Sequence, residues 1–221
     1  FIKGNNLIMK YIAECIGTYF LVSVVIGSGI MAENLSNGNV AVALLGNTLA
    51  TGAILFVLIK MFGQISGAHF NPAVSLVIYL KREITLQHCV SFILFQFAGG
   101  FLGVVLANTM FGLDVIQIAQ TGRGGLHIYL GEFIATFGLL ITILGVRKLS
   151  LIALAPAVGL YIASAIWFTS STSFANPAVT FARGFSDTFT GIHPEFIFVY
   201  IALQVAGAAM AMLFMNFLQN E

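Results

Sequence analysis

The sequence predicts an all-α integral membrane protein with six transmembrane helices and two re-entrant half-helices, arranged as an inverted repeat. Three observations lead to this prediction: the composition, the lengths of the apolar runs and a duplicated Asn-Pro-Ala tripeptide. Of the 221 residues, 59% are hydrophobic and 8% are charged, whereas a soluble domain averages about 25% charged residues. Such a chain cannot cover a globular surface with polar groups, so we expect it to lie in a lipid bilayer.

The same composition excludes several classes of function. Nine Lys and Arg against eight Asp and Glu give a net charge of +1, which argues against nucleic acid as a partner. The sequence contains no grouping of nucleophile and base, no cluster of metal ligands and no phosphate-binding glycine loop. We therefore expect neither an enzyme nor a bound cofactor or metal.

Six apolar stretches are long enough to cross a bilayer, which takes about 20 helical residues. They lie at about 10–31, 39–62, 86–110, 128–147, 150–170 and 195–217. Two further apolar segments, 71–80 and 176–185, are too short, because ten helical residues rise only about 15 Å, half of the hydrocarbon core. Short segments at matching places in two halves indicate a pathway through the membrane.

The two halves of the chain repeat three landmarks in the same order. The pairs are Glu14 with Glu132, Asn71-Pro72-Ala73 with Asn176-Pro177-Ala178, and Gln96 with Gln204. We predict one transmembrane domain over residues 1–221, with internal repeats at about 9–112 and 126–221. Because each repeat contains three spans, an odd number, the second repeat enters the membrane from the opposite face. Residues 1–8 precede Met9, a possible initiator, and we expect them to be upstream sequence without a function.

Positive charges in the short loops predict the orientation. Seven Lys and Arg residues share one side if both termini do, and only Arg123 and Arg183 fall on the other. The seven are Lys3, Lys10, Lys60, Lys81, Arg82, Arg147 and Lys148. Because such charges concentrate in cytoplasmic loops, we expect a protein of the cell (inner) membrane with both termini in the cytoplasm.

Each Asn-Pro-Ala tripeptide has the composition of a helix start. Asn is a favoured N-cap, and Pro suits the first helical position because the N–H that it lacks would have no partner there. A single copy is an ordinary helix start, but Asn71 and Asn176 both open segments too short to cross. They predict half-helices that begin in mid-membrane with their positive dipole ends face to face. Residues 63–70 and 169–175 then form non-helical backbone beside a watery cavity, where the Asn amides donate to a passing oxygen.

These features resemble the aquaporin and glycerol-facilitator channels. The resemblance covers nearly the whole chain and rests on Ser66-Gly67-Ala68-His69-Phe70-Asn71-Pro72-Ala73-Val74, Asn176-Pro177-Ala178, Ala13-Glu14, Gly17-Thr18 and two Gln-x-x-Gly elements. It implies a passive pore in each protomer of a homotetramer, and it makes residues 1–221 a single channel domain. It also implies that Glu14 and Glu132 brace the re-entrant loops. We expect His69 to bond within its loop rather than to act as a gate.

The sequence departs from this family at the narrowest point of the expected pore. Most members carry arginine three residues after the second motif's Asn, where this chain has Val179. The family pattern places the other filter positions at Thr51, at Ser173 and on the fifth span, where two ways of counting give Ser164 or Ile166. Small side chains here predict a wide, weakly polar constriction for uncharged solutes larger than water, such as glycerol or arsenous acid.

The segment after the second motif resembles a bacterial branch associated with arsenic resistance, which implies passage of arsenite and methylated arsenicals. Arg183 lies one helical turn beyond Val179 and is expected at the outer mouth, either as a substitute charge or paired with Asp187 four residues on. Exclusion of protons and cations should then depend mainly on the half-helix termini. We interpret the segment containing Arg123 only as a flexible outer loop.

Three alternatives remain open at this point. A water-selective aquaporin would share the whole framework. An ion-coupled secondary transporter also uses inverted repeats and broken helices, but it needs acids or histidines for the coupling ion. Apart from Glu195, the first residue of the last span, Glu14 and Glu132 are the only acids within the predicted spans. A purely structural membrane protein would leave the two half-helices unexplained.

Overall fold

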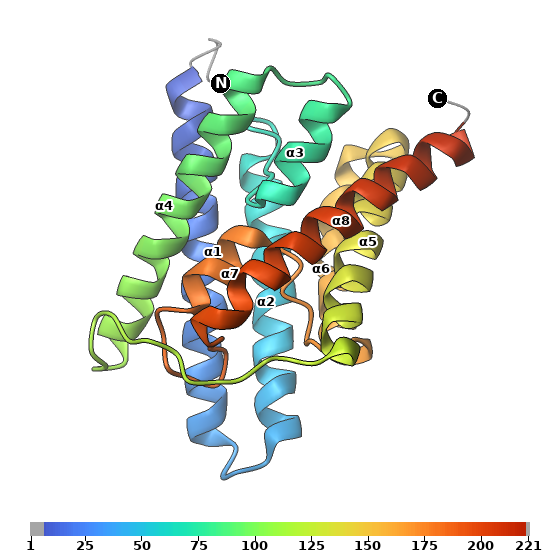
Figure 1. Ribbon diagram of the computed structural model, residues 1–221. Coiled ribbons are helices and arrows are strands. Elements are labelled where there is room, and N and C mark those ends of the chain that lie inside the picture. Colours follow the sequence, from blue (N-terminus) through green and yellow to red (C-terminus); the bar gives the residue numbers. More distant parts are fainter. Residues whose placement is uncertain (1–6, 220–221) are drawn as a thin grey trace.

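The computed structural model describes residues 7–219, which form eight helices and no strand (Figure 1). They are α1 (Leu7–Leu35), α2 (Val40–Phe62), α3 (Pro72–Leu80), α4 (Leu86–Met110), α5 (Leu126–Leu149), α6 (Leu151–Phe168), α7 (Pro177–Arg183) and α8 (Pro194–Gln219). Five of them, α1, α2, α4, α5 and α8, are long and apolar enough to cross a membrane. The 18 residues of α6 rise about 27 Å, close to the thickness of the hydrocarbon core.

The order of six long and two short helices confirms the predicted fold class. The largest difference lies in α1, which begins at Leu7 and continues to Leu35, beyond the predicted 10–31. Its 29 residues rise about 44 Å, so the helix extends past the hydrocarbon core. Leu7 and Ile8 thus belong to a helix, while residues 1–6, which include Lys3, lie outside the described residues.

The helices form two groups of three that are joined in the middle. In the first half α1 packs against α2 and α4, and in the second half α5 packs against α6 and α8. Contacts between α2 and α6 join the groups, and each half-helix also docks on the other half, α3 on α8 and α7 on α4. The start of α1 and the end of α8 lie toward the same end of the bundle (Figure 1).

The outer surface of the bundle is apolar. Many large hydrophobic side chains remain exposed, among them Phe198 at 79% and Leu94 at 62% of their area. Glu14, Glu132, Gln96 and Gln204 are instead fully buried. This distribution, apolar outside and polar inside, suits a chain whose solvent is lipid.

Glycines allow the long helices to cross closely at equivalent places in the two halves. A Cβ atom on Gly99 of α4 would lie 2.1 Å from the carbonyl oxygen of Cys15 in α1. A Cβ atom on Gly207 of α8 would lie 2.5 Å from the carbonyl oxygen of Phe133 in α5. Backbone atoms cannot move aside as a side chain can, so any larger residue would separate the helices.

We expect Gly99→Ala to destabilise the fold by about 1–3 kcal/mol, because the added methyl group forces α1 and α4 apart. The measurement is the thermal unfolding midpoint of the purified protein in detergent. Gly145→Ala is the matched control, since a Cβ atom there would meet only the Met215 methyl at 3.8 Å. Equal midpoints for the two variants would contradict the close crossing.

Candidate functional site

Both half-helices begin at an asparagine cap inside the bundle. The Oδ1 atom of Asn71 accepts a hydrogen bond from the Ala73 N–H at 2.9 Å, and that of Asn176 accepts one from the Ala178 N–H at 3.0 Å. A proline occupies the start of each half-helix. The caps satisfy N–H groups that would otherwise have no partner at a buried helix end.

Each of the two asparagines also makes a hydrogen bond to the other half of the chain. Asn71 Nδ2 donates to the carbonyl oxygen of Ala175 at 2.7 Å, and Asn176 Nδ2 donates to that of Phe70 at 2.8 Å. The two half-helix termini are therefore adjacent. Each amide keeps one hydrogen without a partner in the described chain, and both asparagines line a cavity.

Two buried carboxylates accept hydrogen bonds from the segments that lead into the half-helices, one carboxylate for each segment. The donors to Glu14 are Ser66 Oγ (2.6 Å), His69 N (3.0 Å), Phe70 N (2.7 Å) and Gln96 Nε2 (2.7 Å). The donors to Glu132 are Ser171 Oγ (2.8 Å), Phe174 N (2.8 Å), Ala175 N (3.0 Å) and Gln204 Nε2 (2.6 Å). Four hydrogen bonds satisfy each carboxyl group, which makes its burial tolerable.

The segments held by these carboxylates have a strained backbone. Five non-glycine residues lie in the left-handed region, with φ of 53° at Ala68, 48° at Phe70, 61° at Thr172, 49° at Ser173 and 47° at Ala175. Such residues cost about 1–3 kcal/mol each and persist only where the surroundings fix them. The left-handed residues prevent the segments from closing into helix, which leaves the Phe70 and Ala175 carbonyls free to accept from the asparagines.

A cavity of about 520 Å³ passes the two asparagines. It is lined by Arg123, which lies just before α5, and by Arg147 in the last turn of α5. The 24 residues of α5 rise about 36 Å, so the cavity extends along nearly the whole helix. Apolar side chains from both halves form much of its wall, including Leu21, Val74, Leu139 and Ile162.

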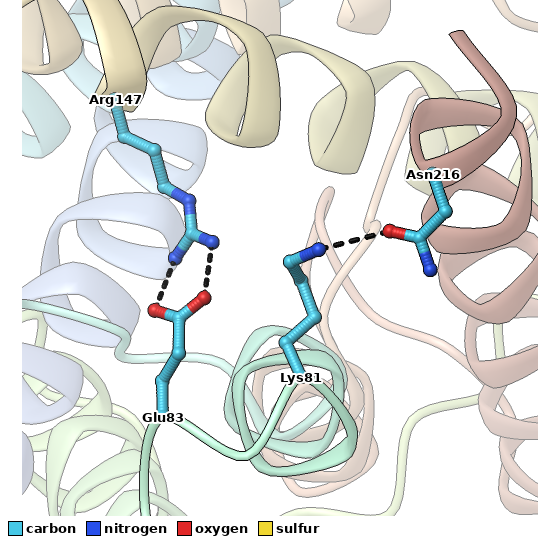
Figure 2. A network of polar contacts seen from close by, with 4 residues as sticks. All are labelled: Lys81, Glu83, Arg147 and Asn216. Atoms are coloured by element: carbon cyan, nitrogen blue, oxygen red, sulfur yellow. Dashed lines mark hydrogen bonds and ion pairs between the residues drawn. The ribbon is translucent and has the colours of Figure 1, made fainter. Parts of the chain in front are cut away.

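A network of polar contacts lies at the Arg147 end of the cavity (Figure 2). Arg147 donates two hydrogen bonds to Glu83, at 2.9 and 2.5 Å, and thereby joins the loop after α3 to the end of α5. Lys81 Nζ donates to Asn216 Oδ1 of α8 at 2.9 Å. These contacts connect the two halves at this mouth, and Glu83 and Arg147 both line the cavity.

The expected filter positions line the cavity, with one exception. Thr51, Ile166, Ser173 and Val179 are buried and line the cavity. Ser164 lies instead on an exposed face of α6, where its hydroxyl donates to the carbonyl oxygen of Leu160 at 2.9 Å. Of the two candidates on the fifth span, Ile166 is the one that lines the cavity.

His69 lines the cavity and also contacts its own half-helix. Its Nδ1 atom lies 2.9 Å from Ser75 Oγ, within hydrogen-bond distance. Its backbone N–H donates to Glu14. The imidazole is thus held at the base of α3.

Arg183 and Asp187 do not form the ion pair that their spacing allows. The i,i+4 argument needs a continuous helix, but α7 ends at Arg183. Asp187 accepts from the Gln120 N–H at 2.8 Å, while Arg183 Nε donates to the carbonyl oxygen of Thr190. Arg183 therefore lines the cavity with its charge not neutralised by Asp187.

The interpretation of the Arg123 segment as a mere flexible loop is wrong. Arg123 Nε donates to the carbonyl oxygen of Gly191 at 2.7 Å, and its guanidinium lies 5.0 Å from the centre of the Phe174 ring. Burial lowers the pKa of Arg123 from its ordinary value. Sequence reasoning missed this residue because the contacts join positions 68 residues apart, and no local pattern marks them.

Two capped half-helices that meet beside a cavity between transmembrane helices define a pore-forming membrane protein. The profile of the Major intrinsic protein family matches residues 2–149. Aquaglyceroporin AqpS of Rhizobium meliloti (strain 1021) is 45% identical over 96% of this chain and 91% of its own length. Nodulin-26 of Glycine max is 29% identical over 91% of this chain and 74% of its own. The chain belongs to the major intrinsic protein family.

A solved structure supports the fold. The X-ray structure of the aquaglyceroporin from Plasmodium falciparum superposes with a TM-score of 0.74, covering 95% of both chains at 21% identity. The family resemblance predicted from the sequence is thereby confirmed, and with it the expectation that the chain is a channel protein rather than an enzyme.

We expect Glu14→Gln to destabilise the protein by about 2–4 kcal/mol, because an amide group presents hydrogens to a site filled with donors. The measurement is the thermal unfolding midpoint in detergent. Glu33→Gln is the control, since Glu33 is an exposed carboxylate. An unchanged midpoint for Glu14→Gln would show that the carboxylate does not hold the loop.

Proposed function

We propose that the protein is a passive membrane channel for water and small neutral solutes, with a filter wide enough for glycerol, arsenite and methylated arsenicals. The observation behind this proposal is Val179, a short apolar side chain beside the cavity at the position where arginine is usual in the family. Ile166 adds a second apolar wall. Neither side chain carries a charge or has the length of an arginine, which leaves more room for a larger solute at these two positions.

The same level offers polar groups of the kind that a neutral hydroxylated solute uses. The hydroxyl oxygens of Thr51 and Ser173 are buried and have no hydrogen-bond partner in the described chain. A buried polar group without a partner is costly, so a solute hydroxyl passing here would gain a hydrogen bond. Glycerol and arsenous acid carry several hydroxyls and no charge, and the carbon atoms of glycerol and of methylated arsenicals can pack against Val179 and Ile166.

The remaining polar groups along the cavity favour a passive mechanism. The unpartnered amide hydrogens of Asn71 and Asn176 supply two donors in mid-path. Glu83 is the one carboxylate among the described lining residues, and it is paired with Arg147. Glu14 and Glu132 are saturated by backbone and side-chain donors, which leaves no acid ready to bind a coupling ion. This arrangement disfavours the secondary transporter.

We propose a homotetramer in the cell membrane with both termini in the cytoplasm. The exposed apolar residues on the outside of the bundle supply surface for both lipid and neighbouring protomers. Lys81 and Arg147 belong to the network drawn in Figure 2, and Arg82 follows Lys81 in the same loop; this is the end of the bundle where α1 starts and α8 ends (Figure 1). Positive charge at that end supports its placement in the cytoplasm.

We test the solute class by stopped-flow light scattering of proteoliposomes with water, glycerol and arsenous acid. Facilitated glycerol and arsenous acid flux that rises linearly with the gradient is expected. A channel that accelerates water alone would contradict the wide filter, and saturable uptake driven by an ion gradient would contradict the passive mechanism.

Val179→Arg should reduce glycerol permeability at least about tenfold and water permeability less than about threefold. The reason is that a guanidinium group at position 179 narrows the cavity and obstructs larger solutes before it obstructs water. The measurement is the same pair of permeabilities per reconstituted protein. Val179→Met, which adds length without charge, is the control and should lie between wild type and Val179→Arg. Glycerol flux in Val179→Arg equal to wild type would show that position 179 does not line the constriction.

A further inference from the structure

We propose that Arg123 is a specificity-determining residue, which together with Arg183 excludes cations from the cavity at the end opposite Arg147. We call Arg123 and Arg183 the outer arginine pair. This inference rests on the proposed channel function and deepens it, since it concerns which solutes the same pathway rejects. It assigns a role to the loop before α5, which the sequence did not mark as functional.

One aromatic ring holds both members of the outer arginine pair. The guanidinium carbon of Arg183 lies 3.3 Å, and that of Arg123 5.0 Å, from the centre of the Phe174 ring. Phe174 is itself fixed, because its N–H donates to Glu132 and its ring contacts Tyr200 edge-on at 5.1 Å. Cation–π contacts of this kind favour a guanidinium at a defined place. The re-entrant segment that forms the filter thus also positions the two charges.

Backbone carbonyls anchor the pair without neutralising it. Arg183 donates to Thr190 O, and Arg123 donates to Gly191 O at 2.7 Å and to Phe189 O at 3.3 Å. Within the described part of the chain, neither guanidinium has a carboxylate partner at ion-pair distance. The nearby acids are engaged elsewhere, Glu132 with its four donors and Asp187 with the Gln120 N–H.

Two positive charges without a carboxylate partner, beside a cavity walled largely by apolar side chains, have a direct consequence. The repulsion between like charges grows as the local dielectric constant falls, so a cation that has lost part of its hydration meets a steep barrier here. A neutral solute meets none and can accept hydrogen bonds from the terminal nitrogens of Arg183, which have no partner in the described chain. The positive charge that is absent at position 179 is thus supplied by Arg183, one helical turn further along α7.

This assignment changes the expectation drawn from the sequence. From Val179 we expected the half-helix termini and the loss of hydration in the pore to be the main barrier to cations, with Arg183 as a substitute charge or paired with Asp187. The structure adds the outer arginine pair, and one member, Arg123, comes from outside both Asn-Pro-Ala segments. Arg123 is also the better test position, because Arg183 is 6% exposed and its replacement would disturb the packing of α7.

The experiment compares two planar solutes of nearly equal size, neutral urea and the guanidinium cation. Tracer efflux of each is measured from proteoliposomes at zero membrane potential for wild type, Arg123→Gln, Arg123→Lys and Arg82→Gln. Arg82 is exposed and does not line the cavity, so Arg82→Gln controls for the loss of an arginine elsewhere. Glycerol flux through the wild type is recorded in the same vesicles.

We expect Arg123→Gln to raise the ratio of guanidinium to urea permeability about tenfold, while Arg123→Lys and Arg82→Gln keep the wild-type ratio. A merely loosened loop would raise both permeabilities together and leave the ratio unchanged, which would overturn the proposal. An Arg123→Lys variant as leaky to guanidinium as Arg123→Gln would also overturn it. Wild-type protein without glycerol flux would instead refute the proposed channel function, an outcome distinguishable from the other two.

Discussion

The structure depends on hydrogen bonds from backbone N–H groups to two buried carboxylates. Glu14 and Glu132 each accept from two consecutive residues of a re-entrant segment, and this is what keeps non-helical backbone stable at membrane depth. The left-handed residues at 68, 70, 172, 173 and 175 would not persist without such partners. Glu132 also fixes Phe174, whose ring contacts the guanidinium groups of Arg123 and Arg183.

From this constraint the rest of the pathway follows. Fixed segments place the two asparagine caps so that each amide reaches a carbonyl of the other half. The caps set where α3 and α7 begin, and those starts set the positions of Val179 and Ser173 beside the cavity. Thr51 of α2 and Ile166 of α6 complete this part of the cavity wall, and these two helices pack directly against each other. The lining of the cavity therefore depends on backbone geometry as much as on the side chains themselves.

Local patterns in the sequence were sufficient to predict the half-helices, and the family resemblance implied that Glu14 and Glu132 brace the re-entrant loops. Asn-Pro-Ala is a cap signal in itself, and its duplication fixed the repeat. The sequence did not show which face of α6 points toward the cavity. Ser164 and Ile166 are two residues apart and therefore lie about 200° apart around the helix, so only one of them can line the cavity. The Arg183–Asp187 pair was wrong because helix ends are difficult to predict. Arg123 acts through contacts between distant loops, which no periodicity reveals.

The exchange of half-helices between the two repeats has a consequence for biogenesis. When the first three spans leave the ribosome, Asn71 has no Ala175 carbonyl to bond, and α3 has neither α8 nor α7 beside it. The first repeat can insert into the bilayer, yet its re-entrant loop remains incomplete until translation of the second repeat ends. Closure of the conduit therefore requires both repeats, and a chain that ended between them would lack the partners of Asn71 and of α3.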